Sequence, residues 1–307
     1  MSIAHLRAVL AIDSRDNLGE GPVWDSAAQR LLWSDHQTGV IHEAKSDGAA
    51  RWCETRRWEL GRPIAAAIPR AAGGLVVAAA NEFVFLSDAG GIEPFARLDI
   101  DLTRYALNDA KCDPQGRLWA GTLAKDFSPS AGLYRIDPDG RAYLMLEKTC
   151  LSNGLDWSPD GSVFYFIDSL SLSVDAFDFD QASGAISNRR SVITIKQGEG
   201  GANGMTVDRE GALWVAMTGG GEVNRYSPDG LLLARVKIGT AGATSCAFGG
   251  EDGADLFVTS RSGRMPEVAQ TVLGLKSEMM DNDGPEAGGL FVCRPGPTAP
   301  PATPFAG

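Results

Sequence analysis

The sequence predicts an all-β fold, a six-bladed β-propeller, because two kinds of short segment each recur six times along the chain. The first kind is a pair of apolar strands joined by a turn that ends in Gly, as in residues 203–216 (NGMTVDREGALWVA). The second kind is a further apolar strand that follows each pair. A repeat of about 43 to 49 residues built from such pieces is typical of propellers, in which each unit forms one four-stranded blade.

Four copies of the paired strands are clear and two are degenerate. The clear copies begin at Glu20, Asn108, Asn153 and Asn203, and in each the turn starts five residues after that polar residue. The degenerate copies cover residues 64–77 and 245–258. The second strands of the pairs centre near Trp33, Val76, Trp119, Tyr165, Trp214 and Phe257. The single strands begin at Gly39, Glu82, Gly132, Ser173, Gly221 and Gly289.

Ring closure and two long loops follow from the same pattern. Residues 5–13 form a predicted strand before the first full unit. We expect it to pair with the last blade near residues 289–294, because an unclosed propeller would expose a strand edge. Residues 122–131 and 260–288 exceed the local loop length. Binding residues concentrate on such loops, so we expect both to shape one side of a pocket.

Length and composition favour a single domain over residues 1–294, because a repeat ring needs all its units to close. We expect residues 295–307, which are Pro-rich, to form a disordered tail. A formal charge of −11 and the lack of a Lys/Arg run exclude binding to nucleic acid or an anionic membrane. Five widely spaced cysteines predict buried thiols in a reducing compartment. We expect a cytoplasmic protein, a monomer or weak homo-oligomer, whose partner is a small molecule.

The four leading polar residues share one register, which is the functional signal in the sequence. If Glu20, Asn108, Asn153 and Asn203 each begin the first strand of a blade, the ring brings them to the same end of the central channel. One carboxylate and several amide oxygens are ligands that hard divalent cations prefer. The bound cation can be calcium, zinc, manganese, magnesium or Fe(II), because these ligands do not distinguish between them. The alternative is that each Asn only adopts a turn conformation before Gly. Four polar residues in the same register favour a cation site over this alternative.

Five segments resemble one known family. They are residues 18–25 (LGEGPVWD), 108–122 (NDAKCDPQGRLWAGT), 152–161 (SNGLDWSPDG), 203–208 (NGMTVD) and 245–250 (SCAFGG). They look like the gluconolactonase/regucalcin family, and the resemblance extends from Glu20 to Phe291. It implies a six-bladed propeller with one divalent metal at the top of the channel and hydrolysis of sugar lactones. It also implies that Glu20 and Asn153 bind the metal, and that Asn108 contacts substrate or metal.

Three positions depart from the family pattern. The family usually has Asp, a metal ligand and favoured general base, where this chain has Asn203. Its substrate-binding Arg falls on Ala106, and its acidic pocket residue falls on Asp126, one methylene shorter than the usual Glu. The resemblance implies metal-assisted ester hydrolysis, with the cation held by Glu20, Asn153 and Asn203.

Metal-assisted ester hydrolysis needs a proton acceptor, and an amide such as that of Asn203 does not take a proton near neutral pH. By sequence, the candidates are Asp126 on the loop of the third unit and His36 after the first unit's second strand. We interpret three other aspartates as turn formers, namely Asp25, Asp113 and Asp208.

Two other functions fit the same residues. One is a metal-dependent hydrolase of a phosphotriester or another non-sugar ester, which the missing Arg at Ala106 favours. The other is a propeller that binds a cation and a ligand without turnover, or with a non-hydrolytic reaction, which the missing Asp at Asn203 favours. The fold alone does not decide between them.

Overall fold

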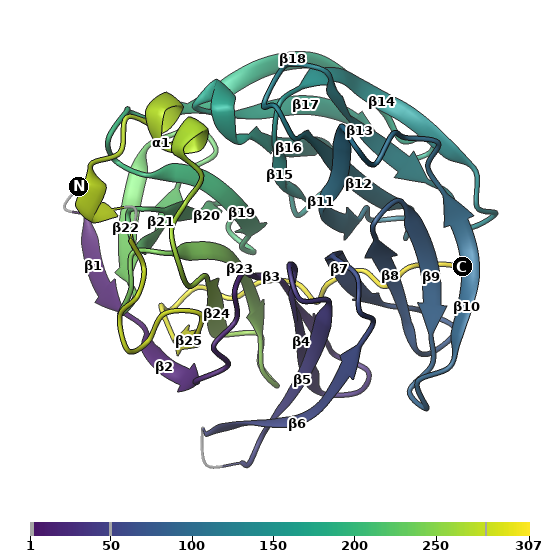
Figure 1. The fold of residues 1–307 in the computed structure, drawn as a ribbon, viewed down its shortest axis with the longest axis horizontal. Coiled ribbons are helices and arrows are strands. Elements are labelled where there is room, and N and C mark those ends of the chain that lie inside the picture. The colour runs from purple at the N-terminus through teal and green to yellow at the C-terminus, as the bar shows by residue number, and fades with distance from the viewer. Residues whose placement is uncertain (1–2, 49–50, 280) are drawn as a thin grey trace.

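The computed structural model describes residues 3–48, 51–279 and 281–307, which form six sheets around a central channel (Figure 1). The first sheet contains β3 (Gly19–Asp25), β4 (Arg30–Asp35), β5 (Val40–Ser46) and β6 (Trp52–Glu59). The second contains β7 (Ile64–Pro69), β8 (Leu75–Ala79), β9 (Glu82–Leu86) and β10 (Ile92–Arg97). The third contains β11 (Tyr105–Cys112), β12 (Leu118–Ala124), β13 (Ala131–Ile136) and β14 (Ala142–Thr149). The predicted six-bladed propeller is confirmed.

The remaining sheets close the ring. The fourth contains β15 (Ser152–Trp157), β16 (Val163–Asp168), β17 (Ser173–Asp180) and β18 (Ala185–Thr194). The fifth contains β19 (Gly201–Val207), β20 (Leu213–Thr218), β21 (Glu222–Tyr226) and β22 (Leu232–Lys237). The sixth contains β23 (Ala243–Gly249), β24 (Asp255–Ser260) and β25 (Leu290–Cys293).

Two N-terminal strands join the last two sheets. β2 (Val9–Ile12) pairs antiparallel with β25, so the predicted closure by residues 5–13 is confirmed for this part. β1 (Ala4–Arg7) instead pairs parallel with β22 and adds a fifth strand to the fifth sheet, which the repeat did not predict. The N-terminal segment therefore ties two neighbouring blades together and covers the outer edge of both.

Aromatic side chains on the second strands form the core between the blades. Trp119 and Trp214 are fully buried, and their indole N–H groups donate to Asp113 (3.1 Å) and Asp208 (2.9 Å). The Oδ1 atoms of the same two aspartates accept backbone N–H groups of their own turns. Their interpretation as turn formers is confirmed, because each carboxylate links a turn to the strand that follows it.

The innermost strand of every blade carries an irregularity near its first residues. The pairing register shifts there in β3, β7, β11, β15, β19 and β23. Such bulges redirect side chains locally. Neighbouring inner strands also approach closely: a Cβ on Gly154 would lie 2.6 Å from the Met205 backbone nitrogen. Gly follows Asn153 because a larger residue would not fit between two blades.

Residues 295–307 differ from the expected disordered tail. They cross the far side of the ring from the sixth sheet to the second, as the yellow chain in Figure 1 shows. Phe305 is fully buried beside Phe85 and Phe95, and its backbone N–H donates to the Pro69 carbonyl (2.8 Å). A Pro-rich composition predicts only a lack of regular structure; buried apolar contacts fix the tail in place.

The long loop after β24 contains α1 (Glu267–Leu273) and the short turn η2 (Ser277–Met279). Met265, Ala269 and Leu273 pack on Leu172, which follows the turn η1 (Ser169–Ser171) of the fourth blade. Figure 1 shows α1 beside this turn. Residue 280 lies outside the described part of the loop.

The five cysteines are free thiols. Cys112 and Cys246 are buried as expected, whereas Cys53 on β6 is exposed. Among the described residues, no helix has the length and apolar character needed to cross a membrane.

Candidate metal centre and substrate cavity

The structure brings the four leading polar residues together. Glu20, Asn108, Asn153 and Asn203 line one cavity of about 170 Å³ at one end of the channel. They come from β3, β11, β15 and β19, so four blades contribute one polar side chain each. The equivalent bulge positions of the other two blades hold Ala65 and Thr244.

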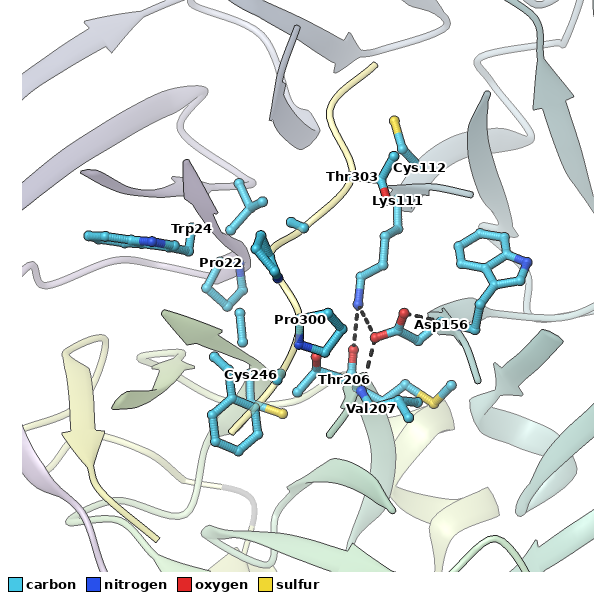
Figure 2. A pocket seen from close by; sticks show the side chains of 18 of the residues that line it. Pro22, Trp24, Lys111, Cys112, Asp156, Thr206, Val207, Cys246, Pro300 and Thr303 are labelled. Carbon is cyan, nitrogen blue, oxygen red and sulfur yellow. Dashed lines mark hydrogen bonds and ion pairs between the residues drawn. The ribbon is translucent and has the colours of Figure 1, made fainter. Parts of the chain in front are cut away.

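A second cavity, of about 220 Å³, lies farther along the same inner strands. It begins at Gly21, Asp109 and Met205, one or two residues after the polar residues of the first cavity. Pro300 and its neighbours in the tail form its far wall (Figure 2). The two cavities therefore occupy opposite ends of the channel.

An ion pair lies in the second cavity. The Lys111 ammonium donates to Asp156 Oδ2 and to the Met205 carbonyl, both at 2.9 Å, and Figure 2 shows it reaching toward Asp156. The same Asp156 oxygen accepts the Val207 backbone N–H at 3.0 Å. These bonds cross three blades, so this end of the channel is held together by an internal ion pair.

In the first cavity, the Asn203 amide is oriented by a hydroxyl. Its Nδ2 donates to Thr218 Oγ1 (2.9 Å), and Thr218 donates in turn to the Ala243 carbonyl. This arrangement leaves Asn203 Oδ1 buried, with no hydrogen-bond partner among the residues that the structure describes. A buried polar atom without a partner is costly, so an oxygen held in this way indicates a missing ligand.

The same arrangement of an amide and a hydroxyl recurs one blade earlier. Asn153 Nδ2 donates to Ser169 Oγ (2.7 Å), and Ser169 donates to the Ala202 carbonyl (2.6 Å). Asn153 Oδ1 accepts from Asn108 Nδ2 (2.8 Å), which also donates to the Ser152 carbonyl (2.8 Å). In both blades, a hydroxyl fixes the amide nitrogen. The amide oxygen of Asn153 accepts from Asn108, whereas that of Asn203 has no partner among the described residues.

Glu20 supplies the negative charge. It is 8% exposed, and burial is the main reason that its pKa is raised well above the usual value. Repulsion from Asp109 raises it further, while the Gly21 backbone, Arg261 and Asn203 lower it. Burial also raises the pKa of Asp109 to about 6. A cation beside Glu20 would favour its ionised form, because an opposite charge offsets desolvation.

These residues fit a divalent cation. Glu20, Asn153 and Asn203 line one cavity, and Asn203 Oδ1 has no hydrogen-bond partner in the described part of the chain. The described residues contain no group of three His, Cys, Asp or Glu side chains that could hold a metal. The candidate ligand set is therefore one carboxylate with neutral oxygens, which are ligands for a hard cation.

Thr218→Val tests the orientation of Asn203. It removes the hydroxyl that accepts from the amide and keeps the shape of the side chain. We expect cation affinity to fall about 10- to 100-fold, the usual effect of losing a group that orients a ligand. Calorimetric titration with Ca²⁺ and Zn²⁺ measures it. Thr218→Ser should retain the affinity, as should Thr206→Val at the other end of β19. Equal affinity in Thr218→Val and the parent would contradict this role.

The structure does not bring Asp126 into the cavity. Its Oδ1 accepts from the Ser128 hydroxyl (2.7 Å) and N–H (3.0 Å), and the carboxylate lies in an exposed hollow beside Arg104. The next residue, Phe127, lines the cavity instead, with a left-handed backbone at φ 58°. Non-Gly residues rarely adopt this conformation, and here it turns an aromatic ring rather than a carboxylate inward.

Two other predicted substrate contacts also lie elsewhere. Ala106 sits on β11 opposite Leu123 and does not line the cavity. His36 is buried near Asp35 and Ile64 outside the cavity, and burial lowers its pKa. A sequence register places a residue along a strand, but the bulges and turns decide which side chains face the channel.

Arg261 and an apolar wall were missed by sequence analysis. Arg261 follows β24, lines the cavity and interacts with Glu20. Its Nε is buried and has no hydrogen-bond partner in the part of the chain that the structure describes. The cavity's apolar residues are Leu18, Leu123, Phe127, Leu151, Leu170, Ala202, Met265, Pro266, Ala269 and Leu273. The expected role of residues 260–288 in shaping this cavity is confirmed for the segment from Arg261 to Leu273. In the sequence, the only signal for this apolar wall was the apolar stretch within residues 260–288.

The fold and this cavity define a six-bladed propeller with a polar, oxygen-rich site at one end of its channel. Residues 18–262 match the family model described as SMP-30/Gluconolactonase/LRE-like region. The chain belongs to this family, as its five motif segments indicated.

Relatives match nearly the whole chain. Regucalcin from Danio rerio is 35% identical over 294 residues, and regucalcin from Homo sapiens is 37% identical over 300 residues, with 94% or more of each chain covered. Among solved structures, a luciferin-regenerating enzyme is 28% identical with a TM-score of 0.85, covering 97% of this chain and 99% of that one. A calcium-binding regucalcin from Agrobacterium tumefaciens has the same TM-score at 24% identity, covering 99% of both chains, which supports the fold.

Proposed function

We propose that the protein is a divalent-cation-dependent hydrolase that opens a lactone, a cyclic carboxylic ester. The observation that carries the proposal is the unpartnered Asn203 Oδ1 in one cavity with the Glu20 carboxylate. Membership of a family whose name includes gluconolactonase makes a sugar lactone the first candidate substrate. We further propose a cytoplasmic protein that acts on a small molecule, as a monomer or weak homo-oligomer.

Each polar residue of the cavity has a proposed role. Glu20, Asn153 and Asn203 hold the cation, and Ser169 and Thr218 orient the two amides. Asn108 fixes Asn153 with its nitrogen, which leaves its own oxygen available to a substrate hydroxyl or the cation. A bound divalent cation supplies polarisation of the lactone carbonyl or a more acidic water.

Proton transfer distinguishes this site from one with an aspartate at position 203. Glu20 is the only carboxylate that lines the cavity in the described residues, and it is assigned to the cation. The Asn203 amide orients groups but takes no proton. Hydrolysis by this chain therefore depends on hydroxide and not on a protein base, and its rate should rise with pH without a plateau from a positioned base.

Acid release from a panel of five- and six-membered lactones tests the proposal. We expect hydrolysis with at least one of Ca²⁺, Mg²⁺, Mn²⁺, Zn²⁺ or Fe²⁺, and its loss with a chelator. Cation binding without hydrolysis of any lactone would contradict the proposal and support a non-hydrolytic propeller. Hydrolysis of phosphotriesters in place of lactones would support the other alternative.

A further inference from the structure

The cation cavity is polar on one side only. Glu20, Asn153 and Asn203 line it from the inner strands, while Phe127, Met265 and Leu273 line it from two loops. Leu273 is 4% exposed and Met265 is 7% exposed, although both belong to a surface loop. A substrate that fills this cavity would be in contact with oxygen ligands at one end and with apolar side chains at the other.

The polar side of the cavity offers few donors for hydroxyl groups. Asn108 Nδ2 makes two hydrogen bonds to protein oxygens, and the Nδ2 atoms of Asn153 and Asn203 make one each. The hydroxyls of Ser169 and Thr218 already donate to backbone carbonyls. Hydroxyl groups of a polyhydroxylated ring that faced Phe127, Met265 and Leu273 would be buried without partners, which is unfavourable.

Arg261 is the exception. Its Nε is buried and has no hydrogen-bond partner among the described residues, so a substrate oxygen that reached it would satisfy this donor. Arg261 also lies near Glu20, at the polar end of the cavity. One guanidinium suits the carbonyl oxygen or the released carboxylate of an ester better than a set of ring hydroxyls, because Arg donates several N–H groups and accepts none.

We infer that the substrate is a lactone or ester with an apolar substituent, bound with its ester group near Glu20 and Arg261 and its substituent against Phe127, Met265 and Leu273. The inference rests on the proposed lactonase activity of the same site and replaces the sugar lactone, the first candidate there, with an apolar lactone or ester. It also accounts for Ala106, since a substrate without several hydroxyl groups does not require the arginine that the family has at this position.

A series of γ-lactones with unbranched alkyl side chains, from methyl to hexyl, provides the first test, with D-gluconolactone as the polyhydroxylated comparison. We expect kcat/KM to rise about fourfold for each added methylene until the cavity is filled, the effect of burying one methylene. D-Gluconolactone should be opened at least about tenfold less efficiently than the best alkyl lactone. A flat response to chain length, or preference for D-gluconolactone, would overturn the inference and leave the lactonase proposal standing.

Met265→Gln provides the second test, because it keeps the length of the side chain and makes it polar. It should lower kcat/KM for the hexyl lactone about tenfold and leave the methyl lactone nearly unchanged. Val268→Gln is the matched control, since Val268 lies in the same loop, is 51% exposed and does not line the cavity. Equal effects of the two variants would contradict a substrate contact at Met265.

A binding measurement separates the inference from catalysis. A cyclopentanone with a hexyl side chain resembles the lactone but has no ester bond to hydrolyse. Calorimetry without added cation should show that it binds the parent protein and binds Met265→Gln about tenfold more weakly. If it binds in this way while no lactone is opened, the lactonase proposal fails and the apolar site stands. If it does not bind the parent, the apolar site is wrong.

Discussion

Asn203→Asp is expected to raise kcat for lactone opening by about 10² to 10⁴, the usual contribution of a positioned general base. The new carboxylate would occupy the place of an amide oxygen that has no partner. The Thr218 hydroxyl, which donates to the Ala243 carbonyl in the present form, could turn to donate to the carboxylate instead. Cation affinity should rise as well, because the site gains a second formal anion.

A pH–rate profile of both forms checks this expectation. The Asp form should show a new ionisation followed by a plateau, whereas the Asn form should continue to rise with pH. Asn153→Asp is the matched control, because it adds the same charge on the neighbouring blade. It should raise cation affinity without giving the same gain in kcat. If Asn203→Asp instead lowers activity on the best substrate and gains nothing on sugar lactones, the protein uses the amide in a different reaction.

Glu20→Gln is expected to abolish stoichiometric cation binding, with a loss of affinity on the order of a hundredfold or more, because the substitution removes the only formal anion of the ligand set. The parent's affinity should also depend on pH. Burial raises the pKa of Glu20, so a proton competes with the cation above the range that is usual for a carboxyl group. Affinity should increase as the pH rises from weakly acid to neutral, and this dependence should be absent in Glu20→Gln.

Elemental analysis after dialysis, together with calorimetric titration at several pH values, measures both effects. Glu222→Gln is a control for the loss of a buried carboxylate elsewhere, since Glu222 pairs with Arg235 on the fifth blade. An unchanged cation content in Glu20→Gln would show that the cation site lies in another place. It would also remove the basis for assigning Asn153 and Asn203 as ligands.

The sequence by itself determined the ring and the register of its polar residues. The strand period, the Gly turns and the six repeats can be read directly from the sequence. Because the repeats close into a ring, residues at the same position of each repeat come close together. Glu20, Asn108, Asn153 and Asn203 therefore reach one cavity as predicted. The turns also depend on residues close together in the sequence. The roles of Asp113 and Asp208 could therefore be predicted from their positions in the turns.

Only the tertiary structure decided what surrounds those residues. Whether Asp126 or Phe127 enters the cavity depends on one left-handed residue in a turn, and the alternation of a strand does not specify it. The positions of Arg261 and Met265 depend on a loop that packs on the fourth blade, and the tail is ordered by the buried ring of Phe305 on the second. These contacts join segments distant in sequence, and their energy comes from apolar burial that no local pattern encodes.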